Sequence, residues 1–334
     1  MKDTQRVTIG ISTHNRIELL KKTLPTIQNQ SYDNIQIRIS CHKCTDGTFE
    51  YLTNQKKDDS RLYFFRCEDD IFYYGLNEAL VGGGDDFCAI GSDDDLYEQA
   101  WLEEMLKALL NAPSAGFAYC ADDCIDSEGL LLKKGRMPFA NHMKLARDSF
   151  HAELRHHFVR GPGVLMRSEV FRRAGMIYPE YIYGDPFLFI GMTRLARAVY
   201  VPQILYHYRV HSRSMTNNNM IDIVDNTRKL MRTYNLALEH YNLTAEESID
   251  FLEALWRGFF VSVPYADDAV IRDIITEYEP IWRGVKNAKI KSMLKLGSYY
   301  PFLMKLVVKL FKKVAAKSER SSNSRILGGP PVIW

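Results

Sequence analysis

The sequence lacks a long apolar run, since no stretch approaches the roughly 18–20 apolar residues that a bilayer-spanning helix needs. The first residues, MKDTQR, are polar and lead directly into a predicted strand, so we expect no secretory signal peptide. Internal repeats and strongly biased segments are also absent. Together these absences favour a globular protein in the cytoplasm, and they exclude fibrous and membrane-spanning classes.

An excess of charge of one sign is also missing, because 43 Lys and Arg against 41 Asp and Glu give a net charge of +2. We expect no nucleic-acid partner. The chain has 6 cysteines, and without an export signal a disulfide framework is not expected. Cys41-x-x-Cys44 and Cys120-x-x-x-Cys124 lack the spacing of a zinc ribbon or finger, so buried or idle thiols are favoured over a zinc site.

Short apolar segments alternate with amphipathic segments through the first part of the chain. We expect strands over 7–12, 35–39, 62–65 and 87–90, and helices over 17–27, 48–52, 77–81 and 101–110. This alternation predicts an α/β fold with a mostly parallel sheet covered by helices on both faces. Further strands are expected over 116–120, 164–166, 198–202 and 205–211, with helices over 168–174 and 187–196. We expect this domain to cover residues 1–216.

Three consecutive acids, Asp93, Asp94 and Asp95, follow the apolar strand 87–90. Like charges in contact repel by about 1 kcal/mol even at the dielectric of bulk water, so something should compensate them. Open α/β sheets bind ligands where their strands end. Carboxylate oxygens suit Mg²⁺ or Mn²⁺, which usually arrive with a substrate phosphate. The alternative is a solvated acidic turn before the helix that begins at Trp101.

Other polar side chains are predicted to gather on the same edge of the sheet as the acids, because parallel strands end together. They are Thr13, Asn15, Arg16, Cys41 and Asn77. A polar edge of this kind suits a nucleotide.

Five short motifs occur in a characteristic order: ISTHNR at 11–16, TDGT at 45–48, GSDDD at 91–95, GD at 184–185 and YRVH at 208–211. In this order and spacing the first ~215 residues resemble a family-2 glycosyltransferase of the GT-A (Rossmann-like) fold. The resemblance implies transfer of a sugar from a nucleotide-sugar donor, usually UDP-linked, with inversion at the anomeric carbon. It also implies a divalent metal cofactor, Mn²⁺ or Mg²⁺.

The same resemblance assigns donor-side roles to individual residues. The loop of Thr13, Asn15 and Arg16 would contact the nucleobase and ribose, with Cys41 and Asn77 beside the donor. Asp93 and Asp94 would also contact the donor.

The resemblance also implies roles for residues that would contact the metal and the acceptor. Asp95 is the preferred metal ligand, and His211 falls where some members add a metal or pyrophosphate ligand. Asp185 falls where the family places its general base. Taken by themselves, Asp185 also suits a helix N-cap and His211 a surface histidine.

The sequence departs from the family pattern at three positions. Ser92 replaces the first acid of the Asp-x-Asp-Asp stretch, Cys41 stands where an acid usually contacts the base, and Gly184 replaces a glutamate. Cys41 leaves uridine specificity open, and Gly184 removes one carboxylate beside the base but not the base itself. The Cys41 and Ser92 departures motivate the alternative of a non-catalytic, GT-A-like partner that binds sugar or lipid.

Residues 217–334 are predicted to form a helical region, with helices over 221–241, 245–260 and 267–282. A basic, apolar segment follows at 286–317. Within it apolar residues recur at helical spacing and lysines fall on the other side, with Tyr299, Tyr300 and Phe302 at its start. This pattern is typical of a helix in the interface of an anionic membrane. The alternative is a helix that packs on the core and carries a solvated lysine face.

The sequence therefore predicts an inverting hexosyl- or N-acetylhexosaminyl-transferase of surface-polysaccharide assembly. Its acceptor would be a glycan or a lipid-linked sugar. We expect it on the inner face of the plasma membrane, bound peripherally. A sugar nucleotidyltransferase is the remaining alternative, but that class wants a glycine-rich, Lys- or Arg-bearing loop after the first strand, which 13–16 does not supply.

Overall fold

A computed structural model describes residues 5–68, 72–134, 148–156, 159, 161–177, 184–212, 232 and 235–309. The chain forms two compact units, one of residues 1–150 and 158–210 and the other of residues 151–157 and 211–334. The first is α/β and the second is helical in the described residues. Residues 216 and 217, where the sequence predicts the boundary, lie outside the described residues.

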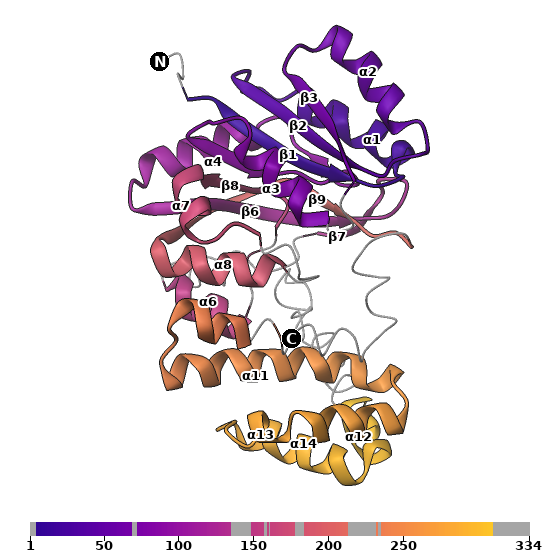
Figure 1. The fold of residues 1–334 in the computed structure, drawn as a ribbon, viewed down its shortest axis with the longest axis vertical. Coiled ribbons are helices and arrows are strands. Elements are labelled where there is room, and N and C mark those ends of the chain that lie inside the picture. Colours follow the sequence, from indigo (N-terminus) through magenta and orange to yellow (C-terminus); the bar gives the residue numbers. More distant parts are fainter. Residues whose placement is uncertain are drawn as a thin grey trace, which may run out of the picture. The chain divides into compact units, whose positions relative to one another are not determined.

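The described strands of the first unit form one nine-stranded sheet (Figure 1). Its strands are β1 (Val7–Thr13), β2 (Ile35–His42), β3 (Leu62–Cys67), β4 (Phe87–Ile90), β5 (Leu96–Tyr97), β6 (Ala115–Ile125), β7 (Leu131–Lys133), β8 (Val164–Arg167) and β9 (Arg197–Arg209). They lie in the order β3-β2-β1-β4-β8-β6-β9-β5, and β7 pairs with β6.

The sheet is mixed, so the predicted parallel arrangement holds only for part of it. Strands β1 to β4 are parallel to their neighbours within that group, and β6 is parallel to β9. Strand β8 runs antiparallel to both β4 and β6, and β5 runs antiparallel to β9. Strand β9 is one strand of 13 residues where the sequence predicts two, because Pro202 falls in a register shift of the β6–β9 ladder.

The helices described around this sheet are α1 (Ile17–Gln28), α2 (Thr48–Asp58), α3 (Phe72–Val81), α4 (Trp101–Asn111), α7 (Ser168–Arg173) and α8 (Gly184–Leu195). Successive residues of β1 point to opposite faces of the sheet. Ile9 and Ile11 join the buried cluster that contains Leu20 of α1 and Trp101 of α4. Gly10 faces Leu80 of α3. Helices therefore cover both faces, as the sequence predicts.

The leucines and the methionine of α4 at 102, 105, 106, 109 and 110 recur at the spacing predicted for one inward stripe of the helix, and one of them lies outside the core. Leu110 is 42% exposed, whereas Trp101 at the start of the helix is fully buried. Leu109, Met105 and Leu102 are buried as predicted. The stripe therefore ends one residue early, close to the end of the helix.

The second unit contains α11 (Ala245–Ser262), the 3₁₀ turn η1 (Val263–Tyr265), α12 (Asp268–Glu277), α13 (Glu279–Trp282) and α14 (Ala288–Tyr299), and residues 301–309 are also helical. Helix α6 (Ser149–His156) contributes residues to both units. The predicted helix 267–282 is interrupted at Tyr278, just before Pro280, which lacks the N–H needed to continue it. Most of the predicted helix 221–241 lies outside the described residues, although 235–241 is helical.

Among the described residues, no helix combines the length and the apolar character that crossing a bilayer requires.

The contact of β1 with α3 gives a stability test. A Cβ atom at position 10 would lie 2.7 Å from Leu80 Cγ, so Gly10→Ala overpacks a buried contact. We expect it to lower the free energy of unfolding by about 1–3 kcal/mol in urea titrations. Because the clash needs the Leu80 side chain, Gly10→Ala combined with Leu80→Ala should cost less than the sum of the single changes. Additive costs would contradict this packing.

Candidate active site

The acidic residues lie in a tight loop between β4 and β5. The amide of Gly91 donates to Gly10 O at 2.8 Å, which continues the β1–β4 pairing by one residue. A Cβ atom at Gly91 would lie 2.7 Å from Ile11 Cγ1, so glycine lets the loop leave the strand close to β1. The side chains of Asp93 and Asp95 are consequently buried, at 3% and 1% exposure.

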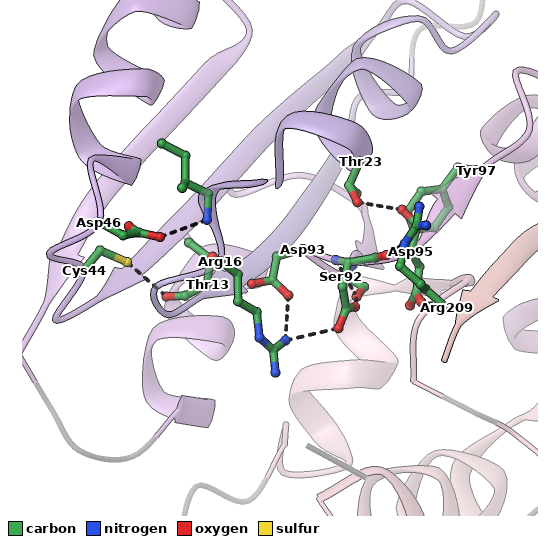
Figure 2. A network of polar contacts seen from close by, with 12 residues as sticks. Thr13, Arg16, Thr23, Cys44, Asp46, Ser92, Asp93, Asp95, Tyr97 and Arg209 are labelled. Atoms are coloured by element: carbon green, nitrogen blue, oxygen red, sulfur yellow. Dashed lines mark hydrogen bonds and ion pairs between the residues drawn. The ribbon is translucent and has the colours of Figure 1, made fainter. Parts of the chain in front are cut away.

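Asp95 is held by hydrogen bonds to both its carboxylate oxygens and to its carbonyl oxygen. Its carboxylate Oδ1 accepts from the Arg209 amide at 2.7 Å, and Oδ2 accepts from the Tyr206 hydroxyl. Its carbonyl accepts from Thr23 Oγ1 at 2.7 Å (Figure 2). Burial and the Asp94 charge raise the pKa of Asp95, and the hydrogen bonds from Arg209 and Tyr206 work against that rise.

Arg209 ties three segments together although its side chain is almost fully buried. Nε donates to the carbonyl of Asp94 at 2.7 Å. Nη1 donates to the carbonyls of Asp126 and Ser127 at 3.1 and 2.9 Å. The end of β9 and the turn after β6 are thereby attached to the acidic loop.

Arg16 neutralises the other two acids. Its Nη1 atom lies 3.0 Å from Asp93 Oδ1 and 3.1 Å from Asp94 Oδ2 (Figure 2). Burial works to lower the pKa of Arg16, but the charges of Asp93 and Asp94 outweigh it and raise that pKa. Ser92 supports the arrangement, since its hydroxyl donates to Asp94 Oδ1.

One acidic oxygen is left without a partner. Asp93 Oδ2 is buried and makes no hydrogen bond of ordinary geometry with the described residues. Burial raises the pKa of Asp93 and the charge of Asp94 raises it further, although the nearby Thr13 hydroxyl works to lower that pKa. A buried carboxylate oxygen without a donor is costly, and a bound cation or donor group would relieve that cost. Among the described residues, no group of three or more His, Cys, Asp or Glu side chains is placed to hold a metal ion.

The loop of Thr13, Asn15 and Arg16 is attached to the loop after β2. Cys44 Sγ donates to the Thr13 carbonyl at 3.5 Å, and the Thr45 amide donates to Asn15 Oδ1 at 2.8 Å. Asn15 has a φ of 50°, in the left-handed region that asparagine tolerates.

Cys41 lies at the same edge of the sheet as Thr13. It pairs with Thr13 in the β1–β2 register and is buried. Its hydrogen bond with Cys44, together with burial, raises its pKa, so the thiol is neutral. The structure therefore brings four of the predicted donor residues to one edge of the sheet: Thr13, Asn15, Arg16 and Cys41.

Asp185 lies in the first turn of α8 and is connected to the acidic loop through a short turn. Its Oδ2 accepts from the Gly161 amide at 3.1 Å, and a Cβ atom at Gly161 would lie 2.6 Å from the same oxygen. Two residues on, the Gly163 amide donates to Ile90 O at 3.3 Å, at the end of β4. Gly163 also lies against the ring of Tyr206, the partner of Asp95. The contacts Asp185–Gly161 and Gly163–Tyr206–Asp95 thus join the two predicted acid sites.

Two predicted site residues are not connected to this network by the contacts described. The Asn77 amide is fully used on the backbone of Ile177, donating at 2.5 Å and accepting at 3.0 Å. This pairing gives Asn77 a structural role in holding α3, and its predicted donor contact stays a prediction. His211 belongs to the second unit, so its metal role also stays a prediction.

Tyr206 and Thr23 were not identified from the sequence, although both bind Asp95. Tyr206 is 111 residues from Asp95 along the chain. Its only sequence signal is its place in an apolar strand, where a buried tyrosine hydroxyl needs a partner. Thr23 lies among the inward residues of α1 and gives the same weak signal.

The Tyr206 contact gives a second test. Tyr206→Phe keeps the ring but leaves Asp95 Oδ2 buried without this donor. We expect a loss of about 1–3 kcal/mol in the free energy of unfolding, because a buried acceptor loses its donor. Tyr63→Phe is the matched control, since Tyr63 is 43% exposed, and it should change little. Equal stabilities of the two variants at neutral pH would contradict the anchoring of Asp95.

Comparison with solved structures identifies the fold. S. aureus TarS 1–349 in complex with UDP-GlcNAc matches with a TM-score of 0.67 and 13% identity, covering 93% of this chain and 92% of that chain. The mannosyltransferase PcManGT from Pyrobaculum calidifontis, in complex with GDP-Man and Mn²⁺, matches with a TM-score of 0.57 and 16% identity, covering 92% and 88%. These neighbours confirm the predicted GT-A fold.

Sequence comparison gives the family. An uncharacterized glycosyltransferase of Haemophilus influenzae is 22% identical over 332 residues, covering 95% of this chain and 98% of the relative. The GalNAc(5)-diNAcBac-PP-undecaprenol beta-1,3-glucosyltransferase of Campylobacter jejuni is 29% identical over 134 residues, covering 39% and 41%. The model of glycosyl transferase family 2 matches residues 8–175, half of the chain. The chain therefore belongs to glycosyl transferase family 2, and it is a glycosyltransferase.

Proposed function

We propose that this enzyme transfers a sugar, with inversion, from a UDP-sugar to a glycan or lipid-linked acceptor in the assembly of a surface polysaccharide. The observation that carries the proposal is the connection of Asp185 to the acidic loop through Gly161, Gly163 and Tyr206. It joins a carboxylate suited to deprotonate an acceptor hydroxyl to a cluster suited to hold a diphosphate.

The donor side would be formed by Arg16, Asp93 and Asp94. A guanidinium is a natural partner of a diphosphate. The unpartnered Asp93 Oδ2 and the partly exposed Asp94 are hard oxygen ligands, so the residues fit Mg²⁺ or Mn²⁺. One or two carboxylates suffice, because such ions usually complete their shell with substrate phosphate and water. A divalent cation held there would supply positive charge that stabilises the leaving nucleoside diphosphate.

The contacts of Asp95 favour a different role from the predicted one. Both its carboxylate oxygens accept hydrogen bonds within the fold, whereas Asp93, which is also buried, has one oxygen without such a donor. We therefore propose Asp93 and Asp94 as the metal contacts and Asp95 as the residue that positions their loop. The predicted direct contact of Asp95 with the metal remains to be tested.

Asp185 would act on the acceptor. As a carboxylate within reach of the attacking hydroxyl, it would accept the proton as the new bond to the anomeric carbon forms. The Gly161 amide holds one of its oxygens. Because Gly161 has no side chain, the Asp185 carboxylate can lie directly against this turn.

The donor and acceptor classes rest on the relatives. TarS was solved with UDP-GlcNAc and PcManGT with GDP-Man, so nucleotide sugars are the donors to test. The Campylobacter jejuni relative acts on an undecaprenol-linked glycan, and this supports a lipid-linked acceptor here. Thr13, Asn15 and Cys41 would contact the nucleoside, and with Cys41 in place of an acid the base specificity is the least determined feature.

Asp185→Asn tests the base. Asparagine can still accept from the Gly161 amide but cannot take a proton, so the fold should be kept. On whichever of UDP-glucose, UDP-N-acetylglucosamine and GDP-mannose the wild type consumes with Mn²⁺, we expect kcat to fall by about 10²–10⁴-fold. Donor binding by calorimetry should be nearly unchanged. Asp33→Asn, at a carboxylate that is 93% exposed, is the control, and wild-type kcat in Asp185→Asn would remove this residue from the mechanism.

Arg16→Gln tests the donor side without a turnover assay. In the absence of nucleotide Arg16 is the cation that balances Asp93 and Asp94, so it competes with Mn²⁺ for them. We expect the variant to bind Mn²⁺ roughly tenfold more tightly by electron paramagnetic resonance, because a like charge is removed. Arg61→Gln removes a comparable pair with Asp59 outside the site and should have no effect. Weaker Mn²⁺ binding in Arg16→Gln would reject these metal contacts.

A further inference from the structure

The last described part of the second unit has two faces of different character. Helix α14 and the helix 301–309 meet at Tyr300, before Pro301, so the continuous basic helix predicted from the sequence is broken there. Gly297 makes the close contact between them, since a Cβ atom there would lie 2.2 Å from Met304 Sδ. Met304 and Val308 are buried and form the inward face of the second helix.

The opposite face is apolar and exposed. Residues 302, 303 and 306 recur at the spacing of one helix face, and two tyrosines precede them at the turn. The exposed fractions are Tyr299 66%, Tyr300 61%, Phe302 61%, Leu303 45% and Leu306 42%. We call these five side chains the aromatic face. A contiguous patch of exposed apolar side chains of this kind marks a surface that binds a partner.

The segment that carries the aromatic face is basic. Residues 286–309 contain Lys286, Lys289, Lys291, Lys295, Lys305 and Lys309 but no Asp or Glu. Asp268, from α12, pairs with Lys305 at 2.5 Å. The other five lysines make no ion pair with the described residues, and all five are exposed. The segment 286–309 therefore presents five exposed lysines that no described acid neutralises.

We propose that the aromatic face binds the surface of an anionic lipid bilayer. Tyrosine and phenylalanine rings enter the region between headgroups and acyl chains, where one end of the ring is wet and the other is apolar. Lysines with long apolar stems reach past them to lipid phosphates. Exposed rings, exposed leucines and five unneutralised lysines are together the complement of such a surface. A protein partner would have to match the same lysines with acids.

This proposal goes beyond the sugar transfer proposed above and stands without it. It assigns a docking surface to the second unit, whereas the chemistry is assigned to the first. Loss of membrane binding would leave the Asp185 result unchanged, and an inactive enzyme could still bind lipid.

Vesicle co-sedimentation of the full chain tests the proposal. Wild type should bind phosphatidylglycerol-containing vesicles, bind phosphatidylcholine vesicles much more weakly, and lose binding as salt is added. Phe302→Ser with Leu306→Ser should reduce binding at least about tenfold, because two inserted side chains are lost. The matched control is Leu130→Ser with Leu132→Ser, since these leucines are 68% and 57% exposed in the first unit, and it should bind as wild type does.

A charge variant separates the two contributions. Lys289→Glu with Lys295→Glu should remove the preference for phosphatidylglycerol, since each basic residue near an anionic surface contributes roughly fivefold. Equal binding to both vesicle types by wild type, or unchanged binding in the Phe302 and Leu306 double variant, would overturn the proposal. So would concentration-dependent dimerisation that this double variant abolishes, because a second copy would then cover the face.

Discussion

The structure depends on holding three adjacent carboxylates together, with the side chains of Asp93 and Asp95 buried. Repulsion and desolvation both oppose this arrangement, and each acid is stabilised differently. Arg16 supplies a cation to Asp93 and Asp94, whereas Asp95 receives neutral donors from Tyr206 and the Arg209 backbone. The result is a loop whose last acid is fixed by hydrogen bonds within the fold and whose first two are balanced by the charge of one arginine side chain.

Strand β9 is the element that makes this possible. It pairs with β6 along most of its length and with β5 at its end, and it delivers Tyr206 and Arg209 to opposite sides of Asp95. Helix α1 adds Thr23 from the other direction. The acids are thus held by elements distant from them in the chain, α1 and β9. The geometry of the candidate site therefore depends on the packing of β9 and α1 in the first unit.

Sequence reasoning predicted the parts of this arrangement that are local. Strands β1 to β4 are apolar runs bounded by turn residues, and the acids that follow β4 are visible by inspection. The reversed direction of β8 and the two-residue strand β5 were not predictable, because pairing partners set the former and a two-residue strand shows no periodicity. The same holds for Tyr206, whose role depends on a partner far along the chain. The break before Pro301, by contrast, was readable from the residue itself.

Gly163 shapes how relatives of this enzyme can be recombined. It has a φ of 82°, which a residue with a side chain would adopt only under strain. A Cβ atom at this position would also lie 3.0 Å from Tyr206 Cγ, so a larger residue would displace the Tyr206 ring. The ring in turn sets the position of Asp95. A chimaera whose junction falls between residues 163 and 206 would bring together a turn and a ring that were never fitted to each other. In this chain the turn at Gly163 and the strand that carries Tyr206 therefore form one structural module.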